Sequence, residues 1–298
     1  MTGAKAAWPV EVQRANLLTR SCWGCQPGLV NKKIGTMQLI LDKITAPGAP
    51  AGLLRARLIN MLHSSLNTCT STVINGRAGT GKTTLVADFV RKCGRRVAWY
   101  KVDAADSELK IFFRYLIESV RGQRPQFDGD ALMELAQSAT LEDIPMLAEA
   151  FIYELQERAG TPLLIVIEDL HLVYDAEWVV PFFRRLLPLL PMDAHMLITG
   201  RSLPPAPLWR MRSKQTLCVI EEQALSFTVQ EARRLFARYG LTEAQARRAH
   251  EETHGRAFSL DEAARMLAAS ESSRAEQSFV PRRKRKLAFI KQLHGYCL

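Results

Sequence analysis

Apolar residues follow two patterns along the chain, and the patterns divide it into alternating helices and strands. Spacings of three or four residues, typical of amphipathic helices, predict helices at residues 53–62, 84–90, 108–120, 144–158 and 178–190. Short continuous apolar runs predict strands that end at residue 74 and that cover residues 96–102, 163–167, 195–201 and 216–220. Strands that alternate with helices predict an α/β fold with a parallel sheet flanked by helices.

A glycine-rich stretch between the first strand and the next helix matches the pattern G-x-x-x-x-G-K-[ST] of a phosphate-binding loop. Glycine lets backbone N–H groups converge on phosphate oxygens, and the following helix N-terminus adds partial positive charge. Lys82 is expected to reach the β and γ phosphates, and the Thr83 hydroxyl to ligate Mg²⁺. A chance match is disfavoured, because the required strand and helix flank the loop. The predicted nucleotide-binding residues are Gly76, Arg77, Ala78, Gly79, Thr80, Gly81, Lys82, Thr83 and Thr84.

Two carboxylates, Glu168 and Asp169, follow the most apolar of the predicted strands. A continuous apolar run is typical of a central parallel strand buried on both faces, and open α/β sheets bind ligands at the carboxyl ends of such strands. After a phosphate-binding loop, the pair is interpreted as a Walker B pair rather than as solubilising caps. One acid would hold Mg²⁺ and the other would orient water, and the spacing leaves the division between them open.

The fourth predicted strand ends at Arg201. An arginine at this position can reach the γ-phosphate across the crevice and report its presence. An arginine in a surface loop is the alternative interpretation. The predicted catalytic residues are therefore Lys82, Glu168, Asp169 and Arg201, and the predicted metal ligands are Thr83, Glu168 and Asp169.

Composition places the chain among ordinary globular proteins: it has 298 residues, of which 47% are hydrophobic and 23% charged. No uninterrupted apolar run reaches the ~18 residues of a membrane span, and the N-terminus has no apolar signal core. We therefore expect a cytoplasmic protein without a membrane partner. The six cysteines are dispersed, and Cys22 and Cys25 are interpreted as reduced thiols rather than as half of a zinc site.

The net charge of +10 is concentrated near the end of the sequence, because residues 282–286 and Lys291 supply six basic side chains. No acidic residue follows residue 281. A basic tail over residues 281–291 can bind nucleic acid or an acidic partner, although a solvated tail is an equal alternative.

Further motifs accompany the phosphate-binding loop. The second predicted strand reads Trp99-Tyr100-Lys101-Val102-Asp103, the Walker B strand continues as Ile167–Leu172 with a trailing histidine, and Thr199–Leu208 joins the arginine to a proline-rich turn. Together with residues 113–116 and 225–232, these motifs resemble the MalT-like, LuxR-associated STAND class of P-loop ATPases over residues 37–268. The resemblance implies an ASCE/AAA-like sheet, with the predicted strands ordered 5-1-4-3-2, and ATP or ADP with Mg²⁺ as the cofactor.

Periodicity and composition, together with the lid that the resemblance implies, divide the chain into four expected parts. Residues 1–36 would form a poorly structured leader, 37–225 the nucleotide-binding domain, 226–268 a helical lid and 269–298 a basic tail. Thr228 is a candidate cap of the first lid helix, with Glu231 completing a capping box.

The function implied is an ATP-binding, slowly hydrolysing signalling switch. It would be the core of a LuxR/MalT-type transcriptional regulator without sensor or helix-turn-helix domains, acting through a protein partner or self-association. Two alternatives stay open: an AAA-like DNA-associated ATPase of the helicase-loader type, and a non-catalytic adaptor that only holds nucleotide.

Overall fold

The computed structural model describes residues 33–34, 37–48, 52–157, 160–214 and 216–278. The chain forms two compact units, which divide after Leu39. In the first unit, the short strands β1 (Lys33–Ile34) and β2 (Met37–Gln38) pair antiparallel. Cys22, Cys25 and the basic residues from 281 onward lie outside the described residues.

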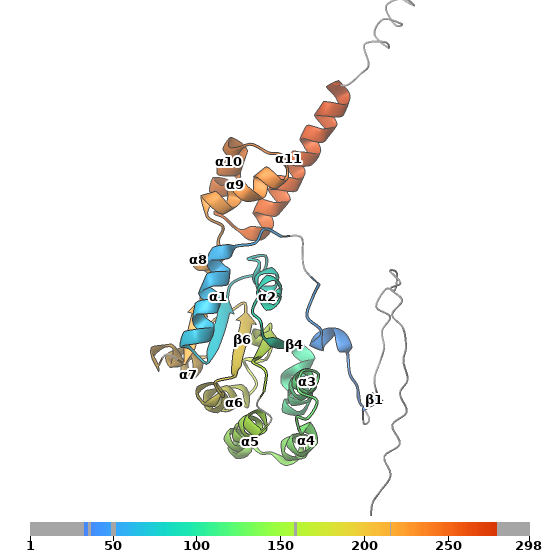
Figure 1. The fold of residues 1–298 in the computed structure, drawn as a ribbon, viewed down its shortest axis with the longest axis vertical. Coiled ribbons are helices and arrows are strands. Elements are labelled where there is room, and N and C mark those ends of the chain that lie inside the picture. Colours follow the sequence, from blue (N-terminus) through green and yellow to red (C-terminus); the bar gives the residue numbers. More distant parts are fainter. Residues whose placement is uncertain (1–32, 35–36, 49–51, 158–159, 215, 279–298) are drawn as a thin grey trace, which may run out of the picture. The chain divides into compact units, whose positions relative to one another are not determined.

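A five-stranded parallel sheet forms the centre of the second unit (Figure 1). Its order is β4-β5-β6-β3-β7, and every neighbouring pair is parallel. Counted along the chain, this is the predicted order 5-1-4-3-2, so the predicted fold class is confirmed. The strands are β3 (Ser71–Asn75), β4 (Arg96–Lys101), β5 (Leu163–Glu168), β6 (Ala194–Gly200) and β7 (Leu217–Ile220).

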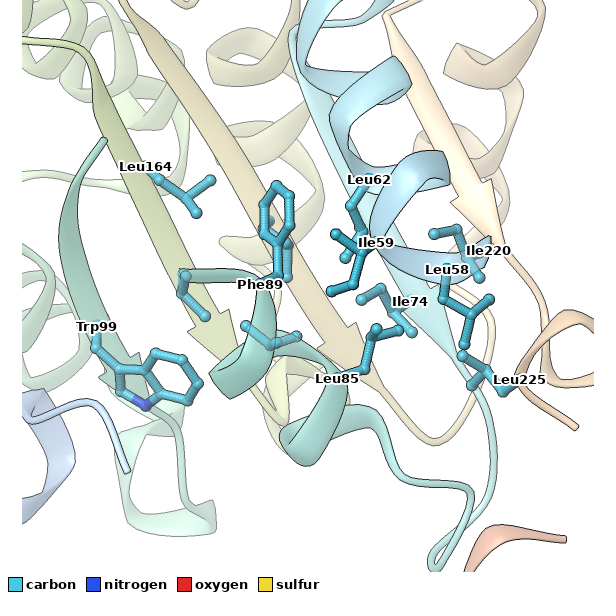
Figure 2. Packing of buried hydrophobic residues seen from close by; sticks show 13 residues of the cluster. Leu58, Ile59, Leu62, Ile74, Leu85, Phe89, Trp99, Leu164, Ile220 and Leu225 are labelled. Atoms are coloured by element: carbon cyan, nitrogen blue, oxygen red, sulfur yellow. The ribbon is translucent and has the colours of Figure 1, made fainter. Parts of the chain in front are cut away.

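Helices α1 (Ala56–Thr68) and α2 (Lys82–Val90) cover one face of this sheet, as Figure 2 shows. Their apolar side chains meet alternate residues of the strands, because successive side chains of a strand point to opposite faces. The buried cluster on this face consists of Leu58, Ile59, Leu62, Ile74, Leu85, Val86, Phe89, Trp99, Leu164, Val166, Leu197, Ile220 and Leu225.

Aromatic side chains connect the other face of the sheet to its helices. The ring of Phe112 lies 5.1 Å from that of Tyr100 on β4 and 4.7 Å from that of Trp178. The neighbouring ring of Phe113 lies 5.6 Å from that of Phe182. All these rings are buried, so each contributes hydrophobic stabilisation as well as ring contacts. The helices of this layer are α3 (Leu109–Arg121), α4 (Gly129–Ser138), α5 (Ile144–Glu157) and α6 (Val179–Leu186).

Two of these helices differ from the prediction: α4 was not predicted, and α6 is shorter than the predicted helix. Helix α4 is absent from the predicted helices, although Asp128 caps it by accepting hydrogen bonds from the N–H groups of Asp130 and Ala131. Helix α6 ends at Leu186 and continues as a 3₁₀ turn through Leu189, because Pro188 cannot extend an α-helix.

Three of the last four helices share a small hydrophobic core of their own, which includes Phe227, Leu235, Phe236 and Leu260, whereas the short helix before them contributes Leu225 to the core of the sheet. Thr228 and Glu231 form the predicted capping box at the start of α9. Helix α11 continues through Ser278, ten residues beyond the expected end of the lid. We call these helices the helical subdomain; they are α8 (Glu222–Leu225), α9 (Val229–Arg238), α10 (Glu243–Thr253) and α11 (Ala257–Ser278).

The segment before α1 packs against β4, the end strand of the sheet. Lys43, in a 3₁₀ turn at Leu41–Ile44, is only 8% exposed. Its Nζ lies 2.6 Å from Oδ1 of Asp106, 2.7 Å from Oδ2 of Asp103 and 4.6 Å from the ring centroid of Tyr115. A buried charge with two carboxylate partners fixes this segment in place.

A chain of buried polar groups crosses from α1 into the sheet. The Ser65 hydroxyl lies 2.5 Å from that of Thr72, which in turn lies 2.8 Å from Nε2 of His195. His195 is only 2% exposed, and burial lowers its pKa to about 4 from the ordinary 6.5. The nearby positive charge of Arg95 lowers it further.

This histidine makes the fold sensitive to acid. In the unfolded chain His195 binds a proton near pH 6.5, whereas in the native state it does so only near pH 4. The unfolded state is therefore favoured as the pH falls through this window, and the free energy of unfolding should drop by up to about 3 kcal/mol. Urea unfolding between pH 7 and pH 4 tests this. His195→Gln should flatten the pH profile.

Candidate functional site

The glycine-rich loop joins the carboxyl end of β3 to the N-terminus of α2. Gly79 and Gly81 adopt φ angles of 77° and 84°, in the left-handed region that favours glycine. The Thr80 hydroxyl donates to the Arg77 carbonyl at 2.9 Å, and the Gly76 N–H donates to the Gly200 carbonyl on β6 at 3.2 Å. The loop is thus curled over the first turn of α2, where free N–H groups favour an anion.

Lys82 and Thr83 begin α2 and bind different partners. The Lys82 ammonium donates to the Gly76 carbonyl at 2.5 Å and to the Arg77 carbonyl at 3.0 Å. Burial lowers the pKa of Lys82, whose exposure is 7%. The Thr83 hydroxyl donates to Oε1 of Glu168, so the loop helix and the end of β5 meet at this hydrogen bond.

The two carboxylates after β5 have different surroundings. Glu168 is 4% exposed, and burial raises the pKa of its carboxyl group although the Thr83 hydroxyl opposes the shift. Asp169 adopts a φ of 58°, its N–H donates to the Thr199 hydroxyl at 3.1 Å, and its carboxylate lies 3.8 Å from Nδ1 of His171. A left-handed backbone is uncommon for a residue other than glycine, and here it occurs directly after the end of β5.

Arg201 follows β6 and is exposed. Because β6 is parallel to β3 and β5, the strand end that precedes Arg201 lies at the same edge of the sheet as the glycine-rich loop and the two carboxylates. Burial lowers the pKa values of Lys82 and His171, and the positive charge of Arg201 lowers both further. The structure therefore brings together the four predicted catalytic residues. Thr84, the last of the predicted loop residues, lies beside Gly52.

Three side chains around the loop were absent from the predicted site. The first is Arg55, at the start of α1, which is 5% exposed. It donates to the Leu225 carbonyl at 2.6 Å and to the Gly81 carbonyl at 3.2 Å, and it lies 4.9 Å from the ring centroid of Phe227. Burial lowers the pKa of its guanidinium to about 10. Nothing in the local sequence distinguishes this arginine from its neighbour Arg57.

The other two come from the helical subdomain. Arg256 donates to the Ala78 carbonyl at 2.6 Å. In the first turn of the adjacent α11, the Phe258 N–H donates to the Gly79 carbonyl at 3.0 Å. Glu222 accepts hydrogen bonds at 2.8 Å from both the backbone N–H and the Nε of Arg77. The subdomain therefore holds the glycine-rich loop through three consecutive residues.

Two cavities flank the loop. One, of about 570 Å³, lies beside Arg77, Glu222 and Arg256. The other, of about 460 Å³, lies against Gly81 and Thr84 at the start of α2 and is also lined by residues of the helical subdomain such as Tyr239. Either volume is within the range of small-ligand sites.

The donor set fits Mg²⁺ bound together with phosphate better than a metal caged by protein alone. Among the residues that the structure describes, no group of three or more His, Cys, Asp or Glu side chains could hold a metal ion. The Thr83 hydroxyl and the Glu168 carboxylate are already in contact, and both are hard oxygen ligands beside an anion-binding helix N-terminus.

Within the same described ranges, no helix has the length and apolarity that crossing a membrane would require.

Comparison with known proteins agrees with this geometry. The family described as AAA ATPase domain matches residues 53–199. The HTH-type transcriptional regulator MalT of Serratia proteamaculans is 32% identical over 187 residues, which cover 62% of this chain and 20% of the relative. MalT of Vibrio cholerae is 26% identical over 199 residues, which cover 66% of this chain and 21% of the relative. The chain thus spans about a fifth of the length of these relatives.

Among solved structures, this chain is similar to a Walker-type ATPase of Pyrococcus abyssi, and the similarity covers 79% of this chain and 75% of that ATPase. It is 13% identical, and its TM-score of 0.45 is too low to carry an argument. The family match and the MalT relatives confirm the resemblance stated from the motifs. The match over residues 53–199 and the similarity to MalT together support a MalT-like P-loop ATPase core.

Proposed function

We propose that this chain binds ATP with Mg²⁺ at the glycine-rich loop, hydrolyses it slowly, and uses the state of the nucleotide to set how the helical subdomain holds the loop. The observation that carries the proposal is the contact between the Thr83 hydroxyl and Glu168, at the point where the helix N-terminus meets the carboxyl end of β5. Phosphoryl transfer needs a cation and fixed dipoles at this meeting point.

Each residue of the site has a chemical task in this proposal. The N–H groups of the loop and the Lys82 ammonium bind phosphate oxygens, while Thr83 and Glu168 hold the metal, which supplies charge neutralisation when bound. Asp169, the more open carboxylate, orients a water and accepts its proton. Arg201 stabilises negative charge on the terminal phosphate.

The cavity of about 460 Å³ is the proposed place of the base and ribose, because it begins at Gly81 and Thr84, next to the phosphate-binding N–H groups. Leu53 and Tyr239 supply apolar surface to it, and Asp261 supplies a carboxylate. A nucleotide lying there would touch both the loop helix and the helical subdomain.

Such a nucleotide would change the contacts of Arg256. In the structure this guanidinium is bound to the Ala78 carbonyl, a neutral acceptor, within reach of the loop that would carry phosphate. A phosphate oxygen is a stronger partner for a guanidinium than a carbonyl is. If Arg256 exchanges the Ala78 carbonyl for a phosphate oxygen, its interaction energy with the loop differs between the chain with nucleotide and the chain without it. A switch requires such a difference between its two states.

Arg256→Ala should therefore uncouple the subdomain from the nucleotide. We expect ATP to protect the amides at the start of α11 from hydrogen exchange in the native chain, and this protection to be largely lost in the variant. Affinity for ATP should fall about tenfold, since one charge-assisted hydrogen bond is removed. Arg248→Ala is the matched control, because Arg248 is an exposed arginine of the same subdomain that pairs only with Glu252 within the described residues. Equal protection in both variants would contradict the coupling.

Native mass spectrometry of the purified chain tests the proposal as a whole. Bound ADP or ATP, lost in Lys82→Ala, is the expected result, and a chain that binds no nucleotide under any condition would overturn it. The same sample shows whether the chain is a monomer or self-associates. Turnover that requires DNA and depends steeply on salt would instead favour the DNA-associated alternative through the basic tail.

A further inference from the structure

The cavity of about 460 Å³ beside the loop helix is lined by the carboxylate of Asp261, in α11. The Tyr239 hydroxyl donates to Oδ1 of this carboxylate at 2.9 Å, and the guanidinium of Arg265 is paired with Oδ2. An ionised carboxylate has about four acceptor positions, so both oxygens can accept a further hydrogen bond. The side chain is 31% exposed, so a ligand in the cavity can reach it.

The start of α11 lies directly against the glycine-rich loop. The Phe258 N–H donates to the Gly79 carbonyl at 3.0 Å, and a Cβ atom on Gly79 would lie 3.0 Å from that of Phe258. Asp261 follows Phe258 by three residues and Arg265 by seven, which are rises of roughly 4.5 and 10 Å along the helix axis. Asp261 is therefore the first ionisable side chain of α11 beyond the contact with the loop.

The chemistry of this position suits the ribose of a nucleotide whose phosphates bind at the loop. The ribose directly follows the phosphates, and the base lies beyond it. The ribose hydroxyls can donate hydrogen bonds, whereas an ionised carboxylate can only accept them. Dinucleotide-binding α/β proteins use an aspartate or glutamate for the ribose 2′-hydroxyl. Apolar side chains of the same cavity, among them Leu53 and Leu235, suit the flat base.

We propose that Asp261 accepts a hydrogen bond from the ribose 2′-hydroxyl of the bound nucleotide and makes the site selective for ribonucleotides over 2′-deoxyribonucleotides. This inference rests on the proposed function, because it requires the phosphates to bind at the glycine-rich loop. Tyr239 and Arg265 are positioning residues, since each binds one oxygen of the carboxylate. A 2′-deoxyribonucleotide has no donor at this position, so it loses one hydrogen bond while its phosphates and base bind as before.

Calorimetric titration of the full chain with ATP and with 2′-deoxy-ATP, both with Mg²⁺, measures the selectivity as a ratio of dissociation constants. A hydrogen bond to a charged group predicts a preference for ATP of about tenfold or more. Asp261→Ala should bring the ratio to about one, because neither nucleotide then finds the acceptor. Glu262→Ala is the matched control and should keep the preference, since Glu262 is the next residue of α11, is exposed and does not line the cavity.

Tyr239→Phe keeps the inference testable if Asp261→Ala fails to fold, because it removes only the hydroxyl that donates to Asp261. It should reduce the preference for ATP about threefold, since a carboxylate that is held less firmly loses more freedom on binding.

The outcomes separate this inference from the proposed function. A native chain that binds ATP and 2′-deoxy-ATP equally, or a preference that survives Asp261→Ala, would overturn the role of Asp261 and leave the nucleotide site intact. A variant that changes the preference for ATP over GTP but not that over 2′-deoxy-ATP would also overturn it, because the carboxylate would then contact the base. A native chain that binds none of these nucleotides would contradict the proposed function itself, and this inference with it.

Discussion

Lys82→Ala is expected to weaken the binding of ATP about thirtyfold to a hundredfold and to abolish measurable turnover. The loss corresponds to one or two hydrogen bonds between an ammonium and phosphate oxygens, worth about 2 to 3 kcal/mol. The lysine is already buried against the loop, where its ammonium donates to the Gly76 and Arg77 carbonyls. Because it is preorganised, little side-chain entropy remains to be lost on binding. Calorimetric titration with ATP and Mg²⁺ measures the change.

Lys92→Ala is the control for this experiment, since Lys92 lies exposed in the turn after α2 and should leave affinity unchanged. The lost carbonyl contacts of Lys82 could also disturb the loop, so the thermal midpoint of both variants should be compared. If Lys82→Ala binds ATP as tightly as the native chain while remaining folded, the nucleotide site has been assigned to the wrong loop.

Asp169→Asn should reduce turnover roughly a hundredfold to ten-thousandfold and change the affinity for nucleotide little. Removal of a positioned general base costs about this much, because water is then neither oriented nor deprotonated. Glu168→Gln should act differently: it weakens the dependence of binding on Mg²⁺, because Glu168 is the acid in contact with the Thr83 hydroxyl. Single-turnover hydrolysis and titrations with and without Mg²⁺ separate the two effects.

These two variants decide between a hydrolysing switch and an adaptor that only holds nucleotide. If the native chain and both variants show only background turnover, the chain does not hydrolyse ATP and the adaptor is favoured. Asp175→Asn is the control, as Asp175 is an exposed aspartate in the turns between β5 and α6. A loss of turnover in that variant as well would show that the effect is not specific to the site.

The parts of the site formed by consecutive residues were predicted from the sequence. The loop between β3 and α2 and the carboxylates after β5 follow from local pattern, because a strand, a turn and a helix specify them within a few residues. The strand order came instead from the resemblance to known ATPases. Periodicity alone indicates which residues form strands, but the pairing of β3 with β6 joins residues more than a hundred positions apart.

The remaining contacts of the site depend on tertiary structure that no local pattern encodes. Arg256 meets the Ala78 carbonyl from 178 positions away, and Glu222 meets Arg77 from 145. Arg55 is buried, although an arginine in an amphipathic helix is ordinarily solvated. Helix α4 was missed for a related reason: Leu132 and Ala136 are its only fully buried apolar side chains, so its periodic signal is weak.

The buried contact of Lys43 with Asp103 and Asp106 has a consequence for where this ATPase core can be cut. The match to the AAA ATPase family begins at residue 53, yet the turn that carries Lys43 lies before that boundary. A fragment trimmed to the family boundary would leave Asp106, which is fully buried, without its counter-ion, and would uncover the outer side of β4. An uncovered strand edge recruits other chains. The contacts that complete this fold therefore begin at least ten residues before its recognisable sequence.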